Sequence, residues 1–416
     1  MKCKICEIAD INSNNLSKND RLDFINYLDT ANLNEGIIDE VQYLKTGIDK
    51  VPSRAKRKVE TNDILISTVR PNQKHYGIIK TKKENLIVST GFAVLRAKKH
   101  IVSPDYLYKF LIQSDITNYL QSIGEGSTST FPAVKPSVIG DLEINLPPLP
   151  EQKAIANILS SLDEKIEINN KINQNLENMA QEIFKQWFVD FEFPNEDGKP
   201  YKSSGGEMVE SELGMIPKDW EVVELDDIIN VNRRGFSPKY ADSGTKVINQ
   251  RCIRNHNIVD EAIQYNDLKL KKPSNEVFLK PKDILINSMG VGTLGRVAQR
   301  TLVNELAIIH SCITIIRANE NKINAYILGR YFISNEKELV NLSIGTTGQT
   351  SLKNKDLAKI KIILPSINIQ NMISDTLMNI SINTDCNLNQ NRNLSNLRDT
   401  LLPKLMSGEI RVPLDK

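Results

Sequence analysis

The hexapeptide Asn62-Asp-Ile-Leu-Ile-Ser67 returns 220 residues later as Lys282-Asp-Ile-Leu-Ile-Asn287. A short apolar run between polar residues is typical of a buried β-strand. Five further pairs of segments recur in the same order with shifts between 218 and 221, among them Val94-Leu-Arg-Ala97 with Ile315-Ile-Arg-Ala318. Matching segments in one order at a nearly constant shift indicate a tandem duplication, so the two copies should share one fold.

Each copy begins with a globular region of mixed strands and helices. Strands are predicted in the first copy at Asp63–Val69, Asn85–Val88, Ala93–Leu95 and Leu142–Leu146, and in the second copy at Asp283–Ser288, Cys312–Arg317 and Lys359–Leu364. A helix is predicted after Ser103-Pro104 and another after Asn324, because these residues favour helix N-termini. The predicted fold class is therefore α/β of the α+β kind, with two pseudo-repeated globular domains.

Each copy ends in a long helical pattern, which Leu146-Pro147 and Leu364-Pro365 precede. Its apolar residues follow mostly steps of four and three, the spacing of a coiled-coil seam. The seam residues are Ile155, Leu159, Leu162, Ile166, Ile172, Leu176, Met179 and Ile183, then Ile369, Ile373, Leu377, Ile380, Leu394, Leu397, Leu401 and Leu405. The six-residue step after Ile166 predicts a register slip near Asn169 and Asn170. We expect the two helices to pack together as an antiparallel coiled coil.

The composition excludes several classes of protein. Of 416 residues, 40% are apolar and 25% charged, as in proteins with packed cores, and no window is apolar enough to cross a bilayer. The first residues lack the apolar core of a signal peptide, and five cysteines are too few for a disulfide scaffold, so we expect a cytoplasmic protein. The net charge of +2 hides a basic stretch, since residues 50–83 contain ten Lys or Arg and two acidic residues. Such a stretch fits phosphate binding or, equally, a solvated lysine-rich loop.

The motifs typical of catalysis are weak or missing. Gly290-Val-Gly-Thr-Leu-Gly295 fits the dinucleotide-binding pattern, but that site needs a helix that begins inside the motif, and strand-like residues follow it. A glycine-rich loop between two strands is the favoured interpretation. Cys3 and Cys6 have zinc-ligand spacing without a second pair or a nearby histidine. The sequence has no P-loop and no Asn-Pro-Pro-aromatic or Asp-Pro-Pro-Tyr loop of amino-methyltransferases. We expect no catalytic residue, no metal site and no cofactor site in this chain.

Basic, amide and hydroxyl side chains gather instead in loops of both copies. Arg and Lys can pair with guanine edges, Asn and Gln with adenine edges, and hydroxyls and Lys often contact phosphates. Each residue alone fits a solvated loop, whereas the repeated set favours DNA binding. The candidates in the first copy are Arg54, Lys56, Arg57, Lys58, Arg70, Lys74, His75, Tyr76, Ser127 and Thr128. The candidates in the second copy are Arg233, Arg234, Lys239, Arg251, Arg254, Asn255, Arg296, Thr346, Thr347 and Gln349.

Over its whole length the chain resembles the specificity (S) subunit of type I restriction–modification systems. Leu146-Pro-Pro-Leu-Pro-Glu-Gln-Lys-Ala-Ile155 resembles the start of the family's central helix, and Asp163-Glu-Lys-Ile166 its continuation. The segment Phe193–Met208 resembles the family's linker, and Leu401-Leu-Pro-Lys-Leu-Met-Ser-Gly-Glu-Ile410 the end of its C-terminal helix.

Two features depart from the family pattern. A Pro-x-x-Trp opening is present at Pro217–Trp220 but missing from the first domain, which leaves the start of that domain open. The second long helix begins with Ser366-Ile-Asn-Ile-Gln370 where the first reads Pro148-Leu-Pro-Glu-Gln152.

The resemblance implies a domain order and a function. Target-recognition domain 1 would span residues 1–146, the central helix 147–192, a linker 193–213, target-recognition domain 2 214–364, and the C-terminal helix 365–416. Each domain would read one half of a bipartite DNA sequence, and the coiled coil would fix the distance between the halves. Two modification (M) subunits, which use S-adenosylmethionine to methylate adenine, would dock on the chain. Restriction (R) subunits, which use ATP and Mg, would join for cleavage. The chain would have no catalytic activity of its own and no contact with a membrane.

Two other hypotheses stay open. One is an S-adenosylmethionine- or nucleotide-dependent enzyme that uses Gly290–Gly295, which cofactor binding by the isolated chain would support. The other is an assembly scaffold that does not read DNA. An unchanged DNA affinity after charge reversal at Arg54, Lys56 and Arg57 would favour the scaffold.

Overall fold

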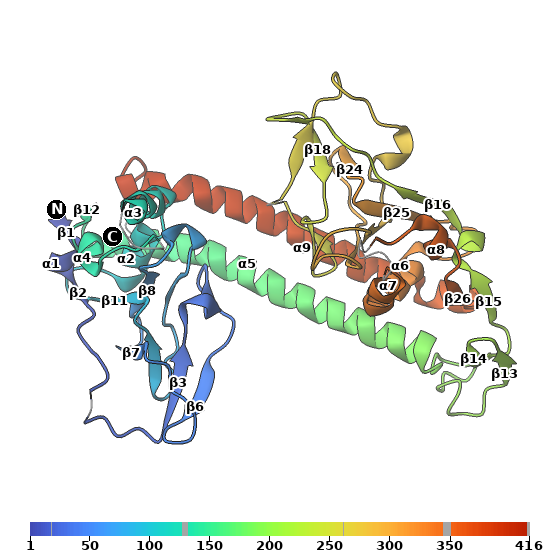
Figure 1. Ribbon diagram of the computed structural model, residues 1–416, viewed down its shortest axis with the longest axis horizontal. Helices are drawn as coiled ribbons and strands as arrows, with labels where there is room; N and C mark the ends of the chain where they lie inside the picture. Colours follow the sequence, from blue (N-terminus) through green and yellow to red (C-terminus); the bar gives the residue numbers. More distant parts are fainter. Residues whose placement is uncertain (18, 127–131, 261, 344–350, 414–416) are drawn as a thin grey trace. The chain divides into compact units, whose positions relative to one another are not determined.

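The computed structural model describes residues 1–416 except 18, 127–131, 261, 344–350 and 414–416. The chain forms two compact units: unit 1 comprises residues 1–166 and 392–416, and unit 2 comprises residues 167–391. Each unit contains one globular domain and a part of the long helices α5 (Leu149–Phe184) and α9 (Ile367–Ser407) (Figure 1). The predicted fold class, two repeated α+β domains with two long helices, is confirmed.

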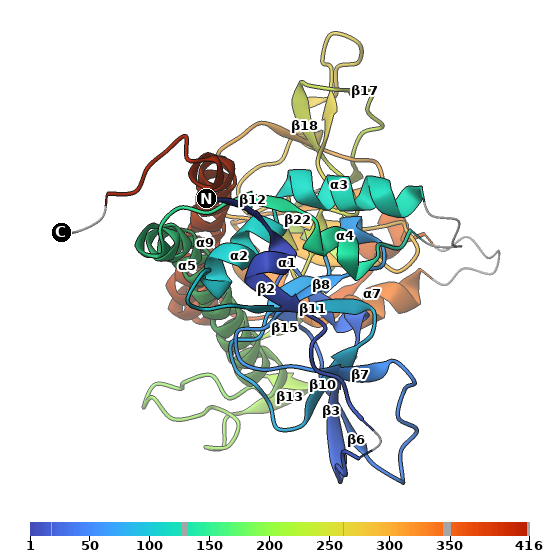
Figure 2. The same cartoon turned by 90° about the vertical axis from the view of Figure 1, so that its left-hand side faces the viewer.

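Unit 1 is built on two four-stranded sheets, with the strand orders β2-β11-β8-β9 and β6-β3-β10-β7. The repeated hexapeptide Asn62–Ser67 contains β8 (Ile64–Ser67), which is buried at every residue. Ile64 and Ile66 pack toward helices α2 and α3, whereas Leu65 packs toward the second sheet. Figures 1 and 2 both show these helices on one side of β8 and β11, and β3 and β6 on the other. The remaining elements are β1 (Lys2–Lys4), α1 (Ile5–Ile8), β2 (Ala9–Ile11), β3 (Phe24–Leu28), η1 (Thr30–Asn32), β4 (Leu33–Asn34), β5 (Ile37–Ile38), β6 (Gln42–Lys45), β7 (Ala55–Lys58), η2 (Pro71–Gln73), β9 (Tyr76–Ile78), β10 (Leu86–Ser89), β11 (Phe92–Ala97), α2 (Pro104–Leu111), α3 (Ser114–Glu125), α4 (Pro136–Gly140) and β12 (Glu143–Asn145).

Unit 2 repeats this plan. Its first sheet has the order β16-β25-β22-β23, and its second sheet, β17-β21-β18-β24, keeps one parallel pair, as the second sheet of unit 1 does. The difference lies at the edge, because the extra strand is β7 beside β10 in unit 1 and β17 beside β21 in unit 2. The elements are η3 (Lys185–Val189, a π-helix), β13 (Met208–Ser211), β14 (Gly214–Pro217), β15 (Glu221–Glu224), η4 (Leu225–Ile228), β16 (Ile229–Arg234), β17 (Tyr240–Ala241), β18 (Thr245–Ile248), β19 (Ile253–Arg254), β20 (Asn257–Ile258), β21 (Gln264–Asn266), η5 (Asn275–Val277), β22 (Ile284–Asn287), β23 (Val297–Gln299), β24 (Ala307–Ile309), β25 (Ile313–Ala318), α6 (Ala325–Ser334), α7 (Glu336–Leu342), α8 (Asn354–Ala358) and β26 (Lys361–Leu364).

Each domain closes on itself before its long helix begins. The first strand pairs with the last one, β1 with β12 and β15 with β26, in antiparallel register. A glutamine in the first turn of each long helix then binds the domain. Gln152 Oε1 accepts a hydrogen bond from Ser103 N (2.9 Å), and Gln370 Oε1 accepts one from Asn324 N (2.8 Å). In both cases the amide group donates to two backbone carbonyls, which fixes the joint between domain and helix.

The helix predicted after Ser103 is in fact two helices, α2 and α3. Ser103 occupies the N-cap position of α2 without a side-chain cap bond, and its backbone N donates to Gln152 of the long helix. The predicted cap of the matching helix is confirmed, since Asn324 Oδ1 accepts from Tyr326 N (2.9 Å) at the start of α6.

The long helices pack antiparallel within each unit. Near the start of α5, Ile155 and Leu159 share a core with Leu405 and Met406 near the end of α9. Near the other end of α5, Phe184 shares a core with residues at the start of α9, Ile369, Ile373, Leu377 and Ile380.

The predicted register slip has a polar cause. Asn169 is fully buried, and its Nδ2 donates to Gln390 Oε1 and Asn391 Oδ1, both at 2.8 Å. Beyond this layer the buried face of α5 turns to Ala180 and Phe184. The seam prediction was therefore wrong at three positions, which are exposed: Ile172 (40%), Met179 (53%) and Leu397 (47%).

Candidate nucleic-acid interface

In unit 1, several candidate residues lie in the turn between β8 and β9, residues 68–75. Arg70 and Lys74 have left-handed backbone conformations (φ 47° and 56°), and the 3-10 turn η2 lies between them. The turn is fixed from outside, because Arg70 N donates to Pro132 O (2.9 Å) and Asn72 N donates to Gln121 Oε1 of α3 (3.2 Å). Lys74 is exposed, and its ammonium group lies 3.2 Å from Glu35 Oε1. The turn thus presents charged and amide groups from a rigid base.

The matching turn of unit 2, residues 288–296, lies at the same position in the fold but contains different residues. It joins β22 to β23, so the predicted glycine-rich loop between two strands is confirmed and the helix of a dinucleotide site is not there. Ser288 O accepts from Leu352 N (3.0 Å), as Thr68 O accepts from Val134 N (2.8 Å) in unit 1. Arg296 bends back over its own turn, with Nη2 donating to Gly292 O (3.0 Å) and Nη1 to Ile253 O (3.4 Å).

The basic strand β7 divides into exposed and engaged side chains. Lys56 and the neighbouring Arg54 are exposed. Arg57 Nη1 donates to Asn15 Oδ1 (2.8 Å), and Lys58 Nζ donates to Asp20 Oδ1 (2.5 Å). The bond from Lys58 lowers the pKa of Asp20 to about 2. Arg57 and Lys58 therefore hold a loop of their own unit, and Arg54 and Lys56 remain the better candidates for a phosphate.

Two other candidates of unit 1 have structural partners. His75 Nδ1 lies 2.8 Å from Leu33 O. Tyr76 packs edge-on against Tyr108, with 6.3 Å between ring centroids, and burial raises the pKa of its phenol. Both side chains stabilise the turn that holds Arg70 and Lys74.

In unit 2 the other candidates lie on β16, in the loop after it, and in or next to a hairpin formed by β19 and β20. Arg233 forms an ion pair with Glu276, and Arg234 Nη2 donates to Leu352 O (2.8 Å), beside the matching turn. Lys239 is exposed, and its backbone N donates to Asn266 Oδ1 (2.8 Å). The hairpin residues Arg251, Arg254 and Asn255 are exposed, and the last of them has a left-handed φ of 48°.

The hairpin is attached to α5 through the residue after Asn255. His256 Nδ1 lies 3.0 Å from Glu177 Oε1, and Arg330 Nη1 lies 2.6 Å from the other carboxylate oxygen. Burial alone would raise the pKa of Glu177, but the hydrogen bond from His256 and the charge of Arg330 outweigh it and lower the pKa to about 2. Glu177 is therefore a carboxylate that fixes the hairpin to the helix.

The candidates Ser127, Thr128, Thr346, Thr347 and Gln349 lie outside the described residues. The turns contain three amides that the sequence analysis did not select: Asn72 and Gln73 are exposed in unit 1, and Gln250 is half-buried beside the turn of unit 2. An amide within two residues of a selected arginine or lysine is the signal that could have identified them.

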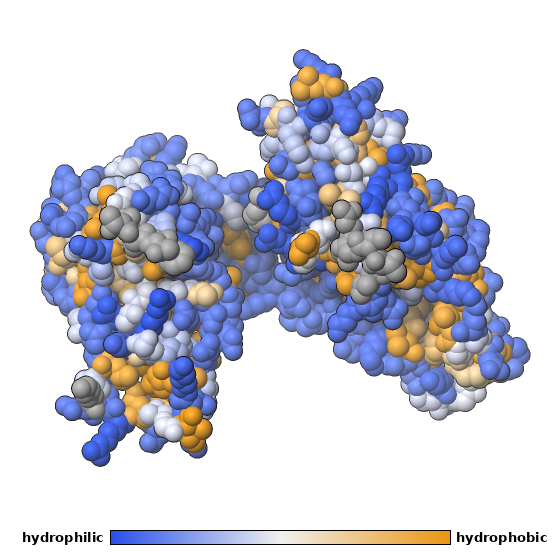
Figure 3. Space-filling model, in the orientation of Figure 1, coloured by the Kyte–Doolittle hydropathy of each residue, from blue (hydrophilic) through white to orange (hydrophobic). Residues whose placement is uncertain are grey.

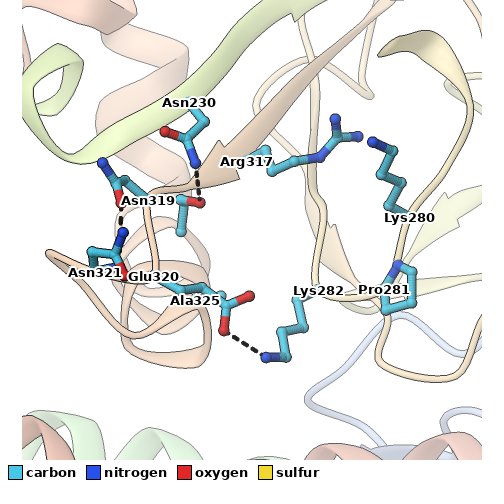
Figure 4. A pocket seen from close by; sticks show the side chains of 10 residues that line it. Asn230, Lys280, Pro281, Lys282, Arg317, Asn319, Glu320, Asn321 and Ala325 are labelled. Carbon is cyan, nitrogen blue, oxygen red and sulfur yellow. Dashed lines mark hydrogen bonds and ion pairs between the residues drawn. The ribbon is translucent and has the colours of Figure 1, made fainter. Parts of the chain in front are cut away.

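An open pocket of about 430 Å³ lies at the other end of β22 and β25, away from these turns (Figure 4). Three of its charged side chains have partners, since Lys282 Nζ lies 2.6 Å from Glu320 Oε2 and Arg317 Nε lies 2.6 Å from the buried Asp283 Oδ1. In the described part of the chain, no group of three or more His, Cys, Asp or Glu residues is placed to hold a metal ion. No helix among these residues is long and apolar enough to cross a membrane.

The largest apolar surface in Figure 3 lies elsewhere, over the ends of β3 and β6 in unit 1. On these strands, Tyr43 of β6 is 62% exposed and stacks on Phe24 of β3 with 5.1 Å between ring centroids. This surface is distinct from the polar turns between β8 and β9.

Comparisons with known proteins agree with the duplication. The family model for the type I restriction modification DNA specificity domain matches residues 1–178 and 217–395. The HindI specificity subunit of Haemophilus influenzae is 28% identical over 96% of this chain and 97% of its own length. The MjaIX specificity subunit of Methanocaldococcus jannaschii is 32% identical over 81% of this chain and 76% of its own length. The crystal structure of an S subunit from M. genitalium has the same fold, with a TM-score of 0.61, 15% identity and coverage of 98% of this chain and 96% of that one.

Proposed function

The chain belongs to the family of type I restriction–modification specificity subunits, and on this premise we propose that each unit reads one half of a bipartite DNA sequence. One observation carries the proposal: the same turn, after β8 and after β22, is anchored in the same way in both units and differs in its exposed side chains. Two domains that read different half-sites need turns with the same backbone anchors and different exposed side chains. Exposed Lys and Arg near each turn supply phosphate contacts.

The complex supplies the chemistry. Two modification subunits that use S-adenosylmethionine methylate one adenine in each half-site, with the base flipped out of the duplex. Restriction subunits that use ATP and Mg cleave the DNA. The antiparallel helices α5 and α9 dock the modification subunits and set the number of unread base pairs between the half-sites. This chain itself holds no cofactor and performs no chemical step.

A methylation map tests the reading function. The chain is co-expressed with its modification subunit in a host without DNA methylation, and methyladenine is located by sequencing. We expect a split motif with one modified adenine in each half. As a matched test, Arg54→Glu combined with Lys56→Glu should weaken binding and reduce its salt dependence. No methylation by an assembled complex with bound cofactor, or an unchanged salt dependence in this variant, would favour the scaffold hypothesis.

A paired insertion tests the spacing function. Asn169 of α5 contacts Asn391 of α9, so four residues inserted beside each of them lengthen both helices at one level. Four residues add about 6 Å of helix. The mapped spacer should change while both half-sites stay the same. An unchanged spacer in a folded complex would exclude the helices as the ruler.

A further inference from the structure

We infer that Val291 is a specificity-determining residue that contacts the 5-methyl group of a thymine in the major groove. The inference rests on the proposed reading function and names one chemical group that unit 2 reads. It starts from the exposure of this side chain, since Val291 is 105% exposed at the tip of the turn between β22 and β23. No other large hydrophobic side chain among the described residues exceeds 73%.

The turn that carries Val291 is rigid. Gly295 N donates to Asn287 O (2.8 Å), and Leu294 N donates to Gly290 O (3.0 Å). The fully buried Asn287 closes the turn from below, with Nδ2 donating to Thr293 O (3.0 Å) and Gln250 O (2.9 Å). The hydrogen bonds within the turn, which include that of Arg296 to Gly292 O, hold the backbone on both sides of the valine. Val291 is therefore projected into solvent by a fixed frame.

The neighbouring glycines make the tip narrow. Gly290 and Gly292 both have left-handed conformations, with φ of +118° and +72°. A Cβ at Gly290 would lie 2.5 Å from Thr293 Oγ1, so packing requires that glycine. A Cβ at Gly292 would meet nothing within 4 Å, so its missing side chain leaves open space beside the valine. A tip that is one side chain wide can approach a base edge closely.

The chemistry of the tip selects the ligand. An isopropyl group neither donates nor accepts a hydrogen bond, and the thymine methyl is the apolar group that a base pair presents in the major groove. Arg296 links the turn to the hairpin at Ile253, and the exposed Arg254 follows directly, so groups that bind phosphates or guanine edges flank the valine. The matching tip of unit 1 presents the polar Asn72 and Gln73, which suit adenine edges.

The test replaces single thymines by deoxyuridine, which lacks only the methyl group. The purified complex of this chain with its modification subunit is titrated with duplexes that carry the mapped motif and one such replacement. One position should weaken binding of the wild type about fourfold, the change that corresponds to about 0.8 kcal/mol for one buried methyl group. Val291→Ala should not respond to that replacement. The control Leu213→Ala, which changes an exposed apolar residue (45%) at the β13–β14 hairpin, should respond as the wild type does.

Several outcomes are decisive. A wild type that responds at no thymine, or a Val291→Ala complex that still responds, would overturn the inference. Equal weakening of Val291→Ala on every duplex would also overturn it, since it would indicate a contact without sequence preference. Thermal unfolding of the variant should match the wild type, because the side chain packs against nothing. A wild-type complex that does not distinguish its motif from unrelated DNA would instead refute the proposed function.

Discussion

The two units attach their domains to the long helices through the same position but with different second partners. Lys109 of α2 and Arg330 of α6, which lie at matching places in the two copies, each bind a carboxylate of α5. In unit 1 that carboxylate, Asp163, also binds Arg398 of α9 (2.9 Å), whereas in unit 2 Glu177 also binds His256. Both copies thus keep an ion pair between the domain and α5. In unit 2 the same carboxylate also binds the β19–β20 hairpin, which contains candidate DNA-binding residues.

The turns after β8 and β22 occupy the same place in the two units, but the residues at their bases and at their tips differ. In unit 1 the residue that corresponds to Asn287 is Ser67, whose Oγ donates to Val69 O (2.8 Å) within the turn, and the tip is polar. In unit 2 the base is the buried Asn287 and the tip is glycine and valine. A tip that reads by shape needs a stiffer base than a tip with long polar side chains. Three substitutions, each with its control, test these two comparisons.

The largest effect is expected from Glu177→Gln. The pKa of Glu177 is about 2 in the folded chain and 4.5 as a free side chain, which corresponds to about 3 kcal/mol of stability. Because the folded pKa is depressed, this stability is present above pH of about 4.5 and is lost as the pH falls toward 2. The free energy of unfolding of the variant should therefore fall below that of the wild type at neutral pH, and the gap should close in acid.

The matched control is Glu167→Gln, also on α5. Glu167 pairs with Lys171 at the surface, where its side chain is 64% exposed, so we expect little change at any pH. A gap for Glu177→Gln that does not narrow between about pH 4.5 and 2 would contradict the assignment of its carboxylate.

A smaller effect is expected from Asn287→Ala. The change leaves Gln250 O and Thr293 O without this donor inside the protein and should cost about 2 kcal/mol. Ser67→Ala, the corresponding change in unit 1, should cost about 1 kcal/mol. Methylation maps should show relaxed reading of one half-site for Asn287→Ala alone. Equal losses of stability and specificity in the two variants would mean that the two bases are equally stiff.

The smallest effect is expected from Lys74→Ala. Its ion pair with Glu35 is exposed at both ends (49% and 59%), so stability should change by less than about 0.5 kcal/mol. If Lys74 contacts a phosphate, the slope of log affinity against log salt concentration should fall by about 0.9. Val291→Ala should leave that slope unchanged. An equal slope for Lys74→Ala and wild type would remove Lys74 from the interface.

Sequence reasoning predicted what local pattern controls. The repeated strands followed from short apolar runs, and β22 and β26 begin within two residues of their predicted starts. The slip near Asn169 was predictable because a six-residue step, from Ile166 to Ile172, interrupts the apolar spacing. The change of the buried face of α5 beyond Asn169 was not predictable. Only the packing against α9 shows that Ala180, and not Met179, is buried.

The partners of the candidate residues were not predictable in the same way. Arg57 and Asn15 are 42 residues apart, and His256 and Glu177 are 79 apart, so no local pattern indicates either pair. A loop arginine that binds its own protein has the same sequence signature as one that is free to bind DNA. The assignment of site residues to DNA therefore stays a prediction, sharpened here toward Arg54, Lys56, Lys74 and the tip of each turn.

The closed domains with their glutamine joints have a consequence for how such chains change over generations. Because β15 pairs with β26, the strands from β15 to β26 lie between two breakpoints, one before residue 221 and one after residue 364. At the joint, the side chain of Gln370 binds backbone atoms only, so this contact does not depend on the side chains of the incoming domain. A genetic exchange at these points would deliver an intact cassette, and a cell could acquire a new half-target in one recombination event.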